Sequence, residues 1–152
     1  MRALNFRRAV LAGIAGTAVM TLMTVMAGVM GMEMDIPGML SGFMGTPVVV
    51  GWIAHFMIGT MLALIYAAGF AAWLPGTPWL RGAVYGLFPF LLAQLAVMPV
   101  MGMGVFTSGA PNAPAMVIGS FMGHLVYGAI VGAIYGRAAG APVIRSAPRI
   151  PA

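Results

Sequence analysis

The sequence predicts an all-α membrane protein, a bundle of four transmembrane helices. Of its 152 residues, 62% are hydrophobic and only 6% are charged, whereas a soluble domain carries about 25% charged residues on average. A membrane-spanning helix needs roughly 20 apolar residues, so the chain has room for four spans, short loops and no separate soluble domain. We therefore expect a single membrane domain over residues 1–152.

Four segments without charged residues fit this length. They cover residues 9–32, 48–74, 82–106 and 115–136. The break between the last two is the stretch "TSGAPNAP", whose glycine and prolines indicate a turn. We predict one transmembrane helix in each segment.

The charges are distributed unevenly along the chain. All seven basic residues precede the first segment, lie between the second and third, or follow the fourth, whereas both acids lie between the first and second. This is the positive-inside pattern of membrane proteins. It predicts cytoplasmic termini, including a cytoplasmic tail over residues 138–152, and it explains the net charge of +5 without a nucleic-acid partner. The chain has no cysteine, so no disulfide is expected.

The chain contains one pattern twice. "HFMIGTMLALIY" (residues 55–66) and "HLVYGAIVGAIY" (residues 124–135) share His, then Gly four residues on, a small residue eight on, and Ile-Tyr at ten and eleven. "VMGM" also occurs twice, at residues 29–32 and 100–103. We predict two tandem helical hairpins, repeat 1 over residues 8–74 and repeat 2 over residues 81–137, inserted with the same orientation as parallel repeats are.

A signal peptide is the alternative for the first segment. "NFRRAVLAGIAG" combines a basic start with an apolar run, which is typical of such peptides. The counterpart of this segment in the second repeat favours a retained helix.

The repeated motifs predict how two helices pack. At 100° per residue, offsets of 4, 8 and 11 share one arc of about 80°. Small residues at four-residue spacing let helices approach closely in lipid. We therefore expect the second and fourth helices to cross near Gly59 and Gly128, with His55 and His124 inside the protein. The tyrosines of the motifs, Tyr66 and Tyr135, are expected in the inner aromatic belt.

Two other segments show local features. "DIPGMLSGFMGTP" predicts a short helix over residues 35–45, with Asp35 as its N-cap and Gly45 at its end. We expect it in the outer interface, either as an anchor or as a lid over the bundle. The third span contains Pro89 and Pro99, and we expect the carbonyls that these prolines free to bond to Gln94 or to the threonines Thr17, Thr21 and Thr24.

Methionine and histidine suggest a soft-metal site. The chain has 16 methionines, and most of them lie toward the predicted outer side. Thioether sulfur favours Cu(I), and imidazole suits copper, iron and zinc. The alternative is that methionine fills irregular gaps in the packing. The residues of the candidate metal site are His55, His124, Met30, Met32, Met101 and Met103.

The two histidines allow two further interpretations. Two imidazoles at one depth, with Gly59 and Gly128 one turn away to admit a flat macrocycle, predict a haem b site ligated by His55 and His124. A purely structural role is the other interpretation, in which the imidazoles bond to each other, to Gln94 or to a carbonyl.

We do not expect an enzyme. The serines have no histidine and acid nearby, and Glu33 and Asp35 stand alone without the spacing of a carboxylate pair. The stretch "GMGVFTSG" lacks the lysine and the strand-to-helix context of a phosphate-binding loop.

Several longer motifs carry a resemblance to a known family. They are "MDIPGML", "GWIAHFMIGTMLALIYA", "LPGTPWLRGAVYG", "MPVMGMG" and "GHLVYGAIVGAIYG". With them the chain resembles a family of small uncharacterised bacterial integral membrane proteins over nearly its whole length. The resemblance implies a location in the bacterial cytoplasmic membrane and the histidine motif as a shared feature, and it implies no substrate.

Three functional hypotheses follow. The first is a non-enzymatic accessory or binding protein that packs against a larger membrane complex or a second copy of itself, with a haem or metal at the two histidines. The small-residue face at Gly119 and Gly123 motivates this packing. The second is a transporter or channel for a soft cation such as copper. The third is a purely structural membrane protein.

Overall fold

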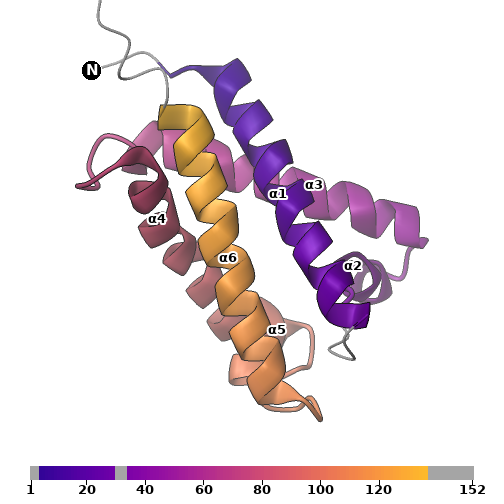
Figure 1. Cartoon of the computed structure of the whole chain (residues 1–152). Coiled ribbons are helices and arrows are strands. Elements are labelled where there is room, and N and C mark those ends of the chain that lie inside the picture. The colour runs from indigo at the N-terminus through magenta and orange to yellow at the C-terminus, as the bar shows by residue number, and fades with distance from the viewer. Residues whose placement is uncertain (1–3, 30–33, 137–152) are drawn as a thin grey trace, which may run out of the picture.

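The computed structural model describes residues 4–29 and 34–136, and all the regular elements in this part of the chain are helices (Figure 1). Four continuous helical stretches, Phe6–Val29, Val48–Phe70, Pro78–Val100 and Ala113–Gly136, are long and apolar enough to cross a membrane. They contain 24, 23, 23 and 24 residues. At 1.5 Å per residue each is about 35 Å long, which exceeds the roughly 30 Å of a hydrocarbon core.

The stretches consist of several elements. The first is α1 (Phe6–Val29), and the short α2 (Ile36–Met44) follows it. The second comprises α3 (Val48–Ile65) and the π-helix η1 (Tyr66–Phe70). The third comprises α4 (Pro78–Leu92), the π-helix η2 (Ala93–Val97) and α5 (Met98–Val100). A 3-10 turn, η3 (Val105–Thr107), precedes α6 (Ala113–Gly136).

The third stretch differs most from its predicted bounds. It begins at Pro78, directly after the N-cap Thr77, and ends at Val100 rather than at residue 106. The end is earlier because the following turn has positive φ angles, 80° at Gly102 and 74° at Gly104, which glycine adopts readily and a helix does not contain. The stretch predicted over residues 48–74 ends at Phe70. The predicted end of the first helix, residues 30–32, lies outside the described residues.

The predicted caps of α2 are confirmed. The side chain of Asp35 accepts a hydrogen bond of 2.9 Å from the amide of Gly38, and Gly45 ends the helix in the left-handed conformation with φ 63°. The helix packs on α3, where a Cβ at Gly51 would overlap the carbonyl oxygen of Pro37. The position of α2 is therefore fixed by α3.

The long helices pack as two hairpins that meet along α1 and α6. α1 packs on α3, α4 packs on α6, and α1 also packs on α6. In Figure 1, α3 runs obliquely to the other three long helices. The start of α1 and the end of α6 lie at one end of the bundle, where Arg8 donates a hydrogen bond of 2.8 Å to the carbonyl oxygen of Ile134. α2, whose N-cap is Asp35, lies at the opposite end (Figure 1). We call these the Arg8 end and the Asp35 end.

The predicted crossing at Gly59 and Gly128 is wrong, because each glycine packs within its own hairpin. A Cβ at Gly59 would overlap the hydroxyl of Thr17 on α1. A Cβ at Gly128 would overlap the carbonyl oxygen of Gly82 on α4. Likewise, Gly13 on α1 faces the α3 backbone beside Gly59, where an added Cβ would lie 2.7 Å from the Cα of Thr60. Gly13 and Gly82 are separated by the same number of residues as His55 and His124, so the two hairpins are packed at corresponding positions.

The core at the Arg8 end is aromatic. Tyr66 is only 1% exposed, and its ring centroid lies 5.1 Å from that of Tyr85. Phe70 and Tyr135 pack against this cluster. The prediction that Tyr66 belongs to an interfacial belt is therefore wrong, because its ring, at the start of η1, packs on Tyr85 of α4 and Tyr135 of α6.

Candidate functional site

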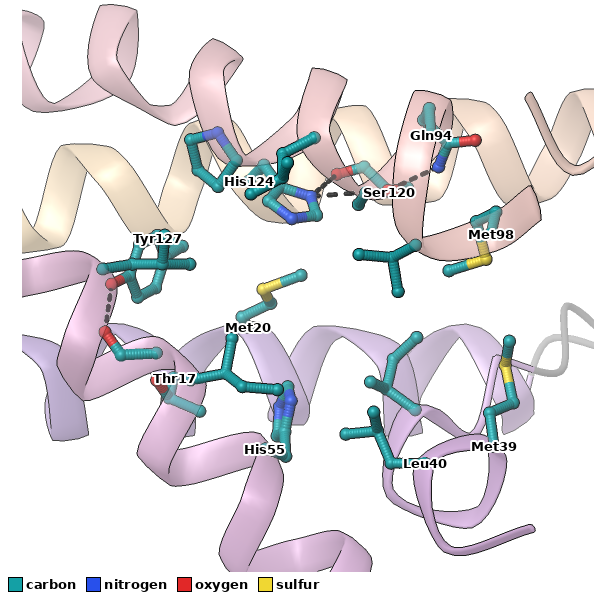
Figure 2. A pocket seen from close by; sticks show the side chains of 18 of the residues that line it. Thr17, Met20, Met39, Leu40, His55, Gln94, Met98, Ser120, His124 and Tyr127 are labelled. Atoms are coloured by element: carbon teal, nitrogen blue, oxygen red, sulfur yellow. Dashed lines mark hydrogen bonds between the residues drawn. The ribbon is translucent and has the colours of Figure 1, made fainter. Parts of the chain in front are cut away.

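A cavity of about 290 Å³ lies between the two hairpins. Side chains from all four long helices and from α2 line it, and Figure 2 shows a part of them. Most of the lining is apolar, and methionine is the commonest residue type in it. Its methionines are Met20, Met34, Met39, Met61, Met98, Met101 and Met116. Its polar residues are Thr17, His55, Gln94, Thr107, Ser120, His124 and Tyr127.

His55 reaches the cavity from α3 and is 8% exposed. Its Nε2 lies 3.0 Å from the hydroxyl of Thr21 on α1. That hydroxyl donates its only proton to the carbonyl of Thr17, at 2.8 Å, so it accepts from Nε2. The neutral ring of His55 therefore carries its proton on Nε2 and has a free lone pair on Nδ1.

His124 reaches the cavity from α6 and has the opposite tautomer. Its Nδ1 lies 2.7 Å from the backbone carbonyl oxygen of Ser120. A carbonyl oxygen can only accept, so Nδ1 carries the proton and Nε2 keeps a free lone pair. Each histidine thus donates one N–H to an acceptor and retains one basic nitrogen. Metal-ligating histidines have this arrangement, because the donated N–H fixes the tautomer and the ring orientation.

Met20 on α1 projects into the space between the two histidines (Figure 2). It is 9% exposed and packs on α6 at Gly123, the residue before His124, where an added Cβ would lie 3.3 Å from its Cε. Met20 was not among the ligands predicted from the sequence. A signal did exist, because Met20 follows Thr17 by three residues and therefore shares its helix face, but the sequence does not indicate that this face meets α3.

The structure brings together only some of the predicted site residues. Met101 and Gly59 line the cavity with His55 and His124. Met103 lines a separate cavity. Gly128 packs directly on α4, so the space that a flat macrocycle would need beside it is filled by the backbone of Gly82. Met30 and Met32 lie outside the described residues.

A chain of polar side chains supports His124 on the side of the Asp35 end. Thr107 donates a hydrogen bond of 3.0 Å to the amide oxygen of Gln94, and the amide nitrogen of Gln94 donates one of 3.1 Å to the hydroxyl of Ser120. Gln94 belongs to the π-helix η2 and is 1% exposed. π-turns inside helices are frequent at functional sites. Gln94 was expected to bond to carbonyls freed by proline, and this is wrong because both ends of its amide bond to hydroxyls. The hydroxyls of Thr17, Thr21 and Thr24 bond to carbonyls of their own helix instead.

Two tyrosines that were not predicted as site residues, Tyr127 and Tyr85, join the two hairpins, and Tyr127 lines the cavity. Tyr127 on α6 donates a hydrogen bond to the carbonyl of Gly59. Tyr85 on α4 donates one of 2.7 Å to the carbonyl of Leu62. Both bonds join the second hairpin to α3, and both side chains belong to the buried core. The two hairpins are therefore tied together by a hydrogen-bonded aromatic cluster beside the cavity.

The side chains that could ligate a metal determine which ion this site could bind. Within residues 4–29 and 34–136, no three His, Cys, Asp or Glu side chains are placed so that they could share a metal ion. A ligand set at this cavity would therefore have to combine imidazole with thioether. Such donors suit a soft cation and not one that requires carboxylates.

The fold and the cavity define a helical protein with four helices that could span a membrane and a methionine-lined site between its two hairpins. The chain belongs to a family of unknown function, since the family model described as "Family of unknown function (DUF6789)" matches residues 4–146. This confirms the resemblance to an uncharacterised family. No curated protein and no solved structure matches the chain.

Proposed function

We propose that this protein is a non-enzymatic membrane protein that binds one soft cation of the Cu(I) class at His55, Met20 and His124. One observation carries the proposal: both histidines of the chain line one cavity, and each is hydrogen-bonded so that one basic nitrogen is left over. Two imidazoles and a thioether are soft or borderline donors that favour Cu(I). A monovalent ion also costs less to hold in an apolar bundle than a divalent one.

The cavity gives less support to haem. Pockets for drug-sized ligands measure about 300–1,000 Å³, and a cavity of about 290 Å³ is only at the lower edge of that range. Met20 occupies the space between the two imidazoles (Figure 2). Gly128, which would have to face the macrocycle, packs on α4. We therefore favour a single ion over haem b.

We favour binding over transport because of the buried aromatic cluster. Tyr66, Tyr85 and Tyr127 are each at most 2% exposed, and they belong to one closely packed buried cluster. A transporter would have to open this cluster, whereas a binding or accessory protein would not. Transport of a soft cation such as copper remains our second candidate.

An accessory role within a larger membrane complex, or in a homo-oligomer, would require a docking surface other than the predicted one. The small-residue face that suggested it is occupied. Gly123 packs on Met20, and a Cβ at Gly119 would lie 3.3 Å from Cε of Met34. A partner would therefore have to dock elsewhere, and lipid is the only partner that the apolar surface itself requires.

We further propose that the protein lies in the bacterial cytoplasmic membrane with both termini in the cytoplasm. The positive-inside pattern supports this orientation. The matching glycine contacts at Gly13–Gly59 and Gly82–Gly128 support a tandem duplication.

Cu(I) binding to the full chain, purified with a tag that contains no histidine, tests the proposal. In competition with a Cu(I) chelator, the wild type should bind one cation at the cavity. The affinity should fall at least tenfold, about 1.4 kcal/mol, in each of the variants His55→Ala, His124→Ala and Met20→Leu. The double histidine variant should be no worse than either single variant, because residues that act as a unit are not additive. Met57→Leu is the matched control, since Met57 is 66% exposed on α3 and lies outside the cavity. Unchanged binding in all three site variants would refute the proposal. A haem absorption spectrum of the purified wild type would show that the ligand is haem and not a single ion.

A further inference from the structure

A second cavity, of about 330 Å³, lies nearer the Asp35 end of the bundle. The last turns of α1, the first half of α6 and the segment between η3 and α6 form its walls. Thr24 and Asn112 are its polar side chains, and no charged residue lines it among the described ones. Its methionines, which come from four separate parts of the chain, are Met23, Met34, Met103, Met116 and Met122.

These methionines line a space instead of filling one. Methionine is common in protein cores because its flexible side chain fills irregular gaps. In this region five such side chains line a cavity of about 330 Å³. Gap filling therefore does not account for them.

The second cavity adjoins the first and also reaches the surface. Met34 and Met116 line both cavities, so they form the wall between them. Pro111 and Asn112, at the other side of the second cavity, are exposed. A ligand that enters beside Asn112 would meet the second cavity before the first.

We infer that the second cavity is a separate soft-cation site made of thioether sulfurs alone, on the route to the histidine cavity. Its ligand is a monovalent soft ion, because neutral thioethers bind Cu(I) and supply no charge to balance a hard or divalent cation. This inference deepens the proposed function. The order of the two sites along a route rests on that function, because it assumes that a cation binds at the histidine cavity. Binding at the second cavity itself does not require the histidines.

Silver ion is the probe, since Ag(I) is soft, monovalent and not subject to oxidation under these conditions. Ag(I) is titrated as the nitrate into the full chain in chloride-free detergent buffer, and the bound equivalents are counted. The wild type should bind two. Met23→Leu combined with Met103→Leu removes two sulfurs that line only the second cavity, and this variant should bind one. Met44→Leu is the control, because Met44 lies at the end of α2, is 40% exposed and lines neither cavity; it should bind two.

The histidine variants separate this inference from the proposed function. His55→Ala combined with His124→Ala should also bind one Ag(I), now with sulfur alone as the neighbour in X-ray absorption. If the double methionine variant binds as many ions as the wild type, the second site is overturned while the first stands. If the double histidine variant still binds two and the double methionine variant binds one, the second site stands and the proposed function fails. Binding of no Ag(I) by the wild type would overturn both.

Discussion

The hydroxyl of Tyr127 on α6 donates a hydrogen bond to the backbone carbonyl oxygen of Gly59 on α3, and so ties one helical hairpin to the other. Gly59 is in turn packed on Thr17 of α1. The bond therefore connects the three helices that carry His55, Met20 and His124. Because Tyr127 and Gly59 both line the cavity, the geometry of the candidate site depends on how the hairpins are joined.

Replacing Tyr127 by phenylalanine should lower the stability of the bundle. The change removes one interhelical hydrogen bond and little volume, and such bonds in membrane proteins contribute about 0.6–2 kcal/mol. Tyr135→Phe is the control, because no hydrogen bond of the Tyr135 hydroxyl is found among the described residues. Unfolding in mixed micelles would measure the difference. Equal stabilities of the two variants would show that the Tyr127 bond contributes nothing.

Alanine at Gly128 should be strongly destabilising. The new Cβ would overlap the carbonyl oxygen of Gly82, which belongs to the backbone and cannot move aside like a side chain. We expect a loss of about 1–3 kcal/mol, as for overpacked cores. Gly28→Ala changes the same atoms where no described neighbour lies within 4 Å of the added Cβ, and it should leave the stability equal or slightly raise it. Similar losses in both variants would contradict the close contact of α4 with α6.

The proposed orientation can be tested with single cysteines, because the chain contains none. Ser108 and Ala72 are exposed and lie between successive long helices at opposite ends of the bundle. In intact cells a membrane-impermeant maleimide should label Ser108→Cys from outside and should label Ala72→Cys only after permeabilisation. The reverse result would place the termini outside the cytoplasm.

The number of helices was predictable because it follows from composition. Uncharged segments long enough to span a bilayer have few alternatives to helix, since an unpaired backbone group in lipid costs several kcal/mol. Asp35 and Gly45 were equally predictable as caps, because cap preferences are local. The early end at Val100 was missed because the apolar run continues to Phe106 while the backbone turns at Gly102 and Gly104.

The packing partners could not be predicted in the same way. A glycine stripe indicates that some helix approaches closely, but it does not identify that helix. Gly59 and Gly128 were therefore assigned to each other, whereas they contact α1 and α4. Met20 was missed as a site residue for the same reason, since only the packing of α1 between α3 and α6 brings it to both histidines. The two histidines were found because the chain contains no others.

The central claim is that His55 and His124 share one cation, and nitrogen NMR of the histidine-labelled full chain tests it most directly. With only two histidines, the spectrum contains two imidazoles. Before the cation is added, His55 should show the tautomer with its proton on Nε2, and His124 the tautomer with its proton on Nδ1. On titration with Ag(I), Nδ1 of His55 and Nε2 of His124 should shift together, with one common affinity. In His55→Ala, the resonance of His124 should no longer shift at the same concentration. If His124 shifts with unchanged affinity in that variant, or if only one histidine shifts in the wild type, the two residues do not form a shared site.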